Sequence, residues 1–111
     1  MIAGIVHHLK RLLGDRGLRP GARRSGQWPA FRRHLLADHP DCVMCGRPAT
    51  EVHHAEEPYH TNPARELDPK NCRCVCRRCH ELGGHLDKWE SLNPTFDRDA
   101  ATWRRKIEAR P

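Results

Sequence analysis

Two CxxC pairs constrain the fold of this chain more than any other feature of its sequence. The first pair is Cys42 and Cys45, and the second is Cys76 and Cys79. Two residues between the cysteines let the backbone turn so that both thiolates face one ion, and four thiolates complete a tetrahedral zinc site. The 30 residues between the pairs exceed the roughly 15–20 of common zinc ribbons. We therefore expect a hairpin with an enlarged loop between the two pairs.

The composition indicates that such a zinc site would stabilise the fold substantially. The chain has 111 residues, of which 37% are hydrophobic and only 5% aromatic, so we expect one small domain with a thin core. Structural zinc contributes on the order of 10 kcal/mol to the folding of small domains of this kind. The alternatives for the four cysteines are two disulfides or free core thiols.

Two further cysteines, Cys72 and Cys74, lie on a predicted strand. We expect one of them to be buried as a small hydrophobic residue. A role for Cys74 as an additional metal ligand is the weaker alternative. No signal peptide and no apolar run of membrane-spanning length is recognisable, so we expect a cytoplasmic protein without a membrane partner. That setting favours metal ligands over disulfides.

The net charge of +6 is concentrated in the N-terminal third of the chain. Residues 1–41 carry eight Lys or Arg and three Asp or Glu, whereas residues 42–85 carry six of each. Sixteen of the twenty basic residues are arginine, whose planar fork of donors suits phosphate. The charge therefore favours a polyanionic partner, with nucleic acid as the first candidate.

We divide the chain into three parts. Residues 1–27 combine an amphipathic helix, predicted from apolar residues at helical spacing over 2–13, with a basic linker rich in Gly and Arg. We expect that helix to dock on the core, on a protein partner or on a second copy of the chain, with DNA contact as the alternative. Residues 28–85 form the core, and residues 86–111 form a C-terminal helical extension.

The local patterns predict alternating helices and strands. Pro29 fits the first turn of a helix that begins near Trp28, ends by Asp38 and has an apolar face. A final helix should place Trp103 and Ile107 on one face. The remaining expected elements are strands at 49–54 and 72–75, a loop at 55–70, a helix after the second CxxC pair that stops at Gly83–Gly84, and the final helix at 97–109.

A second pattern is interleaved with the cysteines. It consists of His53, His54, Asn71 and His80. In order along the chain, the segments CVMCG, EVHH, PKN and VCRRCH resemble the HNH endonuclease family in its four-cysteine, zinc-binding branch of phage and bacterial type. The resemblance covers roughly residues 28–85. It implies an α+β fold, in which a small ββα-metal core carries a four-cysteine zinc site and flanking helices.

The resemblance also implies roles for the residues of this pattern. His54 resembles the general base that activates water. His53 and His80 resemble the protein ligands of a catalytic divalent ion, which would be Mg²⁺, Mn²⁺, Ni²⁺ or Zn²⁺. Asn71 resembles the residue whose side-chain amide hydrogen-bonds backbone near the base and fixes the geometry of the site.

The chemistry of phosphodiester hydrolysis requires groups of these kinds. A neutral imidazole accepts a proton from water near pH 7, and a divalent cation neutralises charge on the phosphate and on the departing oxygen. We therefore predict a metal-dependent DNA endonuclease with a one-metal mechanism, acting in a bacterial or phage-infected cell. The alternatives are a non-catalytic zinc-ribbon module that binds nucleic acid or protein, and a redox protein that uses its CxxC pairs.

Two features of the sequence argue against this interpretation. Adjacent residues of a regular strand point to opposite faces, so a shared site for His53 and His54 needs a strand end or a bulge. After His80 the chain departs from the family pattern and reads Glu-Leu-Gly-Gly before His85. We expect the two glycines to stop the helix early, which leaves His85 as either a third metal ligand or a surface histidine.

Overall fold

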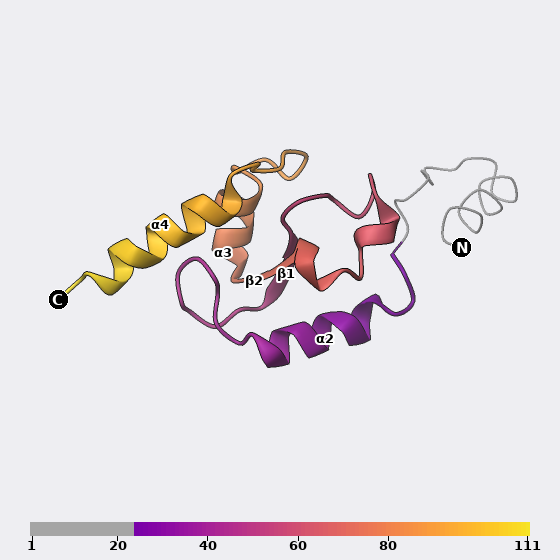
Figure 1. Cartoon of the computed structure of the whole chain (residues 1–111), viewed down its shortest axis with the longest axis horizontal. Helices are drawn as coiled ribbons and strands as arrows, with labels where there is room; N and C mark the ends of the chain where they lie inside the picture. Colours follow the sequence, from indigo (N-terminus) through magenta and orange to yellow (C-terminus); the bar gives the residue numbers. More distant parts are fainter. Residues whose placement is uncertain (1–23) are drawn as a thin grey trace, which may run out of the picture.

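The computed structural model describes residues 24–111. The predicted helix at 2–13 and most of the basic linker lie outside the described residues. The described part is a small α+β fold with one two-stranded antiparallel sheet and three α-helices (Figure 1). In chain order the elements are α2 (Trp28–Asp38), β1 (Glu51–His54), β2 (Cys72–Val75), α3 (Arg77–Cys79), the π turn η3 (His80–Gly84) and α4 (Phe96–Glu108).

Helix α2 forms where the sequence predicted it. Pro29 occupies the first turn, where its missing N–H costs no hydrogen bond, and the His39 N–H closes the last turn on the Leu35 carbonyl at 2.8 Å. The predicted apolar face packs against one side of the sheet, which contributes Val52, Cys72 and Cys74. The side chains of that face are Trp28, Phe31, Leu35 and Leu36.

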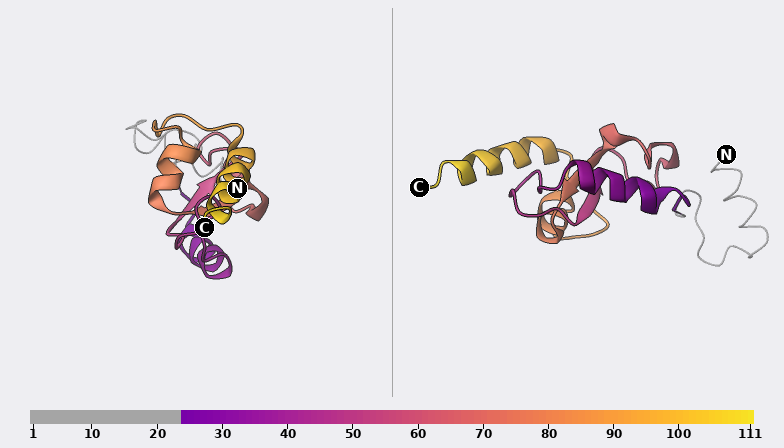
Figure 2. Two further views of the ribbon diagram at one scale, coloured as in Figure 1. Left: turned by 90° about the vertical axis from the view of Figure 1, so that its left-hand side faces the viewer. Right: turned by 90° about the horizontal axis from the view of Figure 1, so that it is seen from below.

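The β1–β2 hairpin divides the core into two layers. Its register pairs Val52 with Cys74, and His53 with Arg73, and no residue is bulged out of the ladder. Alternate residues therefore face opposite sides, and α2 covers one side while α3 and the start of α4 cover the other (Figures 1 and 2). The second layer gathers Cys42, Met44, Ala55, Val75, Cys79, Phe96 and Ala100.

The long connection between the strands is folded on itself. It contains two short 3₁₀ turns, η1 (Pro63–Arg65) and η2 (Pro69–Asn71). The carboxylate of Glu66, which is only 1% exposed, accepts a hydrogen bond from the Ser25 N–H at 3.0 Å and pairs with Arg24 at 3.3 Å. These contacts attach the end of the N-terminal linker to the loop.

The helix after the second CxxC pair ends at Gly84, close to its predicted end, but the two glycines have another reason to be there. A Cβ atom on Gly84 would lie 2.8 Å from the His53 ring, and one on Gly83 would lie 2.6 Å from the Met44 methyl group. Gly84 therefore permits close approach of this helix to His53 of β1, and Gly83 permits close approach to Met44 of the first CxxC turn. The helical turn continues through both glycines.

Helix α4 anchors itself by its first turn and then projects from the core (Figures 1 and 2). Phe96 and Ala100 are buried, whereas Trp103 is 43% exposed. The buried Asn93 side chain orients this turn, because its Oδ1 accepts from the Thr95 N–H and its Nδ2 donates to the Gly83 carbonyl. Among the described helices, none is long and apolar enough to cross a membrane.

Candidate metal centres

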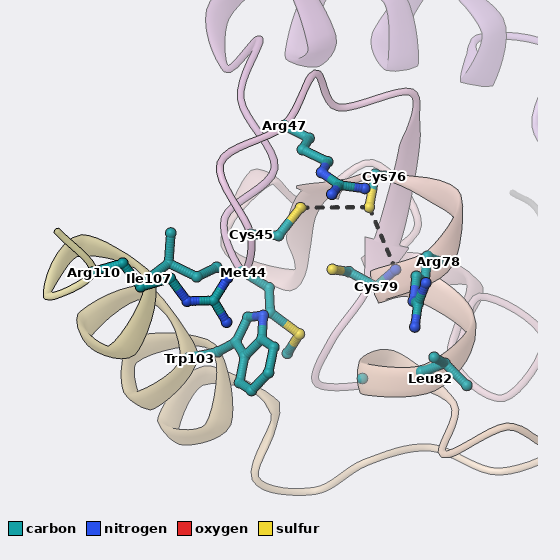
Figure 3. Close-up of a pocket in the computed structure, with 11 residues that line it drawn as sticks. Met44, Cys45, Arg47, Cys76, Arg78, Cys79, Leu82, Trp103, Ile107 and Arg110 are labelled. Carbon is teal, nitrogen blue, oxygen red and sulfur yellow. Dashed lines mark hydrogen bonds between the residues drawn. The ribbon is translucent and has the colours of Figure 1, made fainter.

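The two CxxC pairs come together in one cluster, as the sequence predicted. The four sulfur atoms all lie within 4.8 Å of one another, and the Sγ atoms of Cys45 and Cys76 are 3.7 Å apart (Figure 3). In each pair the N–H of the second cysteine donates to the sulfur of the first, at 3.5 Å and 3.4 Å. Four cysteines in this arrangement could bind a structural metal such as zinc.

The electrostatics of the cluster suit a thiolate-bound cation. Burial would raise the pKa of the Cys42 thiol, but hydrogen bonds from the backbone of Cys45, Cys76 and Met44 outweigh it and lower the pKa to about 7. Burial raises the pKa of the Cys79 thiol, and the neighbouring sulfurs of Cys76, Cys42 and Cys45 raise it further. Removing both protons at once requires a positive charge among the sulfurs, which a bound zinc ion would supply.

Cys72 and Cys74 belong to a different environment. Because they are two residues apart on β2, both side chains face α2, and both are buried rather than only one of them. The Cys74 thiol donates to the Leu35 carbonyl and lies outside the four-cysteine cluster. Burial raises the pKa of Cys72 to about 12, so both residues act as small hydrophobic groups of the α2 layer.

Three histidines form a second cluster on the side of the sheet that faces away from α2. One nitrogen from each of His53, His80 and His85 lies within 4.8 Å of the others. The Nε2 atoms of His80 and His85 are 3.1 Å apart. Tetrahedral ligands at the usual Zn–N length of about 2.0–2.1 Å are separated by roughly 3.3 Å, so the spacing of this pair fits one ion.

Hydrogen bonds behind the rings determine which nitrogens face inward. The Nδ1–H of His80 donates to the Glu51 carboxylate at 2.7 Å, and the Nδ1–H of His85 donates to the Ser91 carbonyl at 2.6 Å. Both partners can only accept, so the neutral rings carry their lone pairs on Nε2. The two Nε2 atoms, 3.1 Å apart, then need a cation between them, which is either a shared proton or a metal ion. Metal-binding histidines are commonly oriented by such carboxylate and carbonyl partners.

His53 supplies the clearest sign that a ligand belongs here. Its side chain is fully buried, and among residues 24–111 neither ring nitrogen has a hydrogen-bond partner. Burial lowers its pKa to about 3, so the ring is neutral near pH 7 and both ring nitrogens stay without a hydrogen-bond partner among these residues. Unpaired polar atoms at such depth are rare in folded proteins, and a metal ion on one nitrogen would account for this one.

A π turn brings His85 into the cluster. Residues five apart on an α-helix, which has about 3.6 residues per turn, point in different directions. Here the His85 N–H donates to the His80 carbonyl at 3.1 Å, which closes the wider turn of a π-helix and returns His85 to the face of His80. Single π turns occur frequently at functional sites. Of the two alternatives that the sequence left open for His85, its place beside His53 and His80 agrees with the ligand role.

His54 lies on the other side of the sheet from His53. The strand pairing is regular up to His54, its last residue. The His54 ring packs on Trp28 at 5.0 Å between centroids, whereas the His53 ring packs on Phe96 at 5.0 Å. Residues 51–54 therefore lack the irregular backbone that a shared site for His53 and His54 would need, and the expectation of such a site is wrong, because the pleat turns His54 away from the histidine cluster.

The surroundings of His54 still define its chemical state. Its Nε2 lies 2.9 Å from the Glu66 carbonyl, which can only accept, so Nε2 carries the proton and Nδ1 carries the lone pair. Burial lowers the pKa of His54 and keeps the ring neutral. The imidazole is therefore oriented and unprotonated on one nitrogen.

Asn71 organises the loop that follows β1. It is fully buried, and its Oδ1 accepts from the N–H groups of Glu56 and Glu57 at 2.9 Å each. Its Nδ2 donates to the carbonyls of Glu57 and Arg65. The amide thus holds the backbone two and three residues after His54, which is the kind of contact that the family resemblance implies for Asn71.

Sequence reasoning missed Glu51, which orients His80. The signal was present, because Glu51 lies two residues before His53 and period-2 alternation puts both on one face of the strand. It also missed Trp89, whose ring lies 5.2 Å from that of His80 and 5.0 Å from that of His85. Trp89 follows the cluster along the chain, in a segment with no periodic pattern.

Comparison with known proteins yields one short match. Residues 64–76 match the family described as a CXCXC repeat. The matched cysteines are Cys72, Cys74 and Cys76, of which only Cys76 belongs to the four-cysteine cluster. No curated protein and no solved structure matches the chain.

Proposed function

We propose that this protein is a metal-dependent DNA endonuclease of the HNH family, with a ββα-metal core. The observation that carries the proposal is the histidine cluster, in which two oriented imidazoles and one buried, unpaired imidazole converge. The cluster lies on the side of the β1–β2 hairpin that faces the following helix. That order of strand, strand and helix is the one expected of a ββα-metal core.

The donor set fits an ion used for chemistry. His53, His80 and His85 supply three ligands, which is the number that leaves a position open in catalytic sites, whereas the four cysteines close their site. A divalent ion held there would supply Lewis acidity toward water and the phosphate. Glu51 and the Ser91 carbonyl keep two of the imidazoles in the tautomer that binds cations.

His54 is suited to the role of general base because its ring is neutral and its tautomer is fixed. Its free Nδ1 can accept a proton because the Glu66 carbonyl holds the proton on Nε2. Since its ring contacts lie on the α2 side of the sheet, the base role requires the phosphodiester to lie across the end of β1. Asn71 supports this end of the strand through its four hydrogen bonds to the backbone.

Arginines near the cluster suit a DNA backbone. Arg77 and Arg78 are exposed on the first turn after β2, and Arg77 also pairs with Glu51 at 3.3 Å. Contacts of this kind bind phosphates without reading base sequence, and they make affinity strongly dependent on salt.

The test is cleavage of supercoiled plasmid DNA by the zinc-loaded protein with added Mg²⁺, Mn²⁺, Ni²⁺ or Zn²⁺. We expect His80→Ala to abolish nicking because it removes a ligand. We expect His54→Ala to lower the rate by about 10²–10⁴, the usual contribution of a general base, while the ion remains bound. His34→Ala, at an exposed position of α2, serves as the matched control and should cleave like the wild type.

Three results would contradict parts of this proposal. Folded wild type that binds both ions but never nicks DNA would indicate the non-catalytic zinc-ribbon module instead. Wild-type rates for His54→Ala, with His80→Ala inactive, would show that the base role is wrong and the metal role correct. Reversible disulfides in place of stoichiometric zinc would indicate the redox protein.

A further inference from the structure

Trp89 presents an exposed aromatic surface at the edge of the histidine cluster. Its side chain is 44% exposed, although its ring centroid lies only 5.2 Å from that of His80 and 5.0 Å from that of His85. An indole that served only the core would be covered. This ring touches two candidate ligands with one part and faces solvent with another.

The loop that carries Trp89 is held in a costly conformation. Leu86 and Asp87 both have positive φ angles, 55° and 64°, a region that residues with side chains rarely adopt. Two backbone hydrogen bonds fix the loop, from the Asp87 N–H to the Glu81 carbonyl and from the Lys88 N–H to the His85 carbonyl, each at 2.9 Å. Such strain persists only where the surroundings impose it, and it is concentrated at functional sites. The indole is therefore presented in a preset position.

A positive charge accompanies the ring. The guanidinium of Arg77 lies over Trp89 at 4.9 Å from the ring centroid, and its side chain is 67% exposed. The guanidinium covers one part of the indole, and the part that stays exposed can take a stacked base whose attached phosphate pairs with the cation.

We propose that Trp89 is a stacking site for an unpaired nucleobase, and that the substrate is single-stranded DNA or DNA with unpaired nucleotides at the cleavage position. The inference rests on the proposed nuclease function and names its substrate class. Bases inside a duplex have both faces covered by their neighbours, so only an unpaired base can lie on this ring. The phosphate attached to that base then lies beside the imidazoles of His80 and His85.

A plainer role for Trp89 is that of a cover that shields the imidazoles from water. The two roles differ in what the removal of the ring affects. A cover stabilises the bound ion, so its removal lowers metal affinity. A stacking site acts on the nucleic acid, so its removal lowers affinity for single strands and leaves the ion in place.

The test compares Trp89→Ala with Trp103→Ala, a matched control of nearly equal exposure (44% and 43%) on α4. The probes are a labelled oligothymidylate with a phosphorothioate backbone, which resists hydrolysis, and the same strand in a duplex, with binding followed by fluorescence anisotropy. We expect Trp89→Ala to weaken single-strand binding by about 5- to 150-fold, the range for loss of one stacked base. Duplex affinity and the number of bound metal ions should not change, and Trp103→Ala should bind like the wild type.

Each other outcome overturns the inference. Equal losses for both strands, or equal losses in both variants, would mean that Trp89 makes no contact specific to an unpaired base. Loss of the ion from Trp89→Ala would identify the ring as a cover. Plasmid nicking by a protein whose single-strand binding ignores Trp89 would refute the stacking site and leave the nuclease standing, whereas absence of binding to either probe would remove both.

Discussion

Gly84 allows the most direct test of the histidine cluster, through the substitution Gly84→Ala. The added Cβ would lie 2.8, 2.9 and 3.0 Å from three atoms of the His53 ring. Ordinary contacts begin at 3.4 Å, so the ring would have to retreat by roughly 0.6 Å. It has little room to do so, because His80, His85 and Phe96 all lie within 5.0 Å of it, centroid to centroid.

The displacement is large compared with what a metal site tolerates. Ligand distances in such sites hold to within about 0.2 Å, so we expect the ion bound by His53, His80 and His85 to bind at least about 10-fold more weakly. Overpacking of a filled core costs about 1–3 kcal/mol, against a gain of about 1 kcal/mol from replacing Gly by Ala in a helix. The net loss of stability should therefore stay within about 2 kcal/mol, and the protein should still fold when zinc is supplied for its four cysteines.

The neighbouring glycine supplies the control. In Gly83→Ala the new Cβ meets the Cε and Sδ atoms of Met44, at 2.6 and 2.7 Å, which form the flexible end of a side chain that can rotate away. Both variants would be titrated with a divalent ion by calorimetry, and their unfolding followed in urea. We expect Gly83→Ala to bind the second ion like the wild type. Normal binding by Gly84→Ala would refute the assignment of His53 to the metal centre.

Three more predictions concern residues around the two centres. Glu51→Ala removes the carboxylate that orients His80 and should lower the affinity of the histidine cluster for its ion by about 10- to 100-fold. Competition with a chelating dye would measure this affinity while zinc stays bound to the four cysteines. Cys45→Ser should abolish stoichiometric binding of zinc and cooperative unfolding, whereas Cys74→Ala should keep both. Metal analysis would measure the bound zinc, and circular dichroism would follow the unfolding. Asn71→Ala leaves buried backbone groups unpaired, each costing about 1–3 kcal/mol, so a loss below about 1 kcal/mol in urea unfolding would contradict its structural role.

Local sequence patterns predicted the parts of this fold that depend on local physics. Helix α2 follows from Pro29 and an apolar face at helical spacing. The four cysteines meet because each CxxC turn is a local structure, and a single ion can hold two of them wherever the intervening chain runs. The opposite directions of His53 and His54 follow from the pleat alone, so the geometric objection raised from the sequence described the strand correctly.

Tertiary contacts decided what the sequence did not reveal. Gly83 and Gly84 suggested the end of a helix, since glycine commonly ends helices, but their reason is the close approach of Met44 and of the His53 ring. The π turn that returns His85 to the cluster depends on one wider hydrogen-bonded turn, which no periodic pattern records. Trp89 lies beside the cluster because Leu86 and Asp87 adopt left-handed backbone conformations. The sequence gives no sign of this turn, since neither position is a Gly or Asn, the residues that usually adopt that conformation.

Cys79 and His80 are consecutive residues, and they belong to different clusters of possible metal ligands, the four cysteines and the three histidines. The helix that carries them begins directly after Cys76, so an ion held by the thiolates would also help to fix the direction of the His80 side chain. If both clusters bind metal as proposed, assembly would have an order, in which zinc binds the four cysteines first and the histidine cluster becomes able to bind its ion only afterwards. The proposed nuclease would then remain inactive in a newly made chain until enough zinc is available to fill the four-cysteine site.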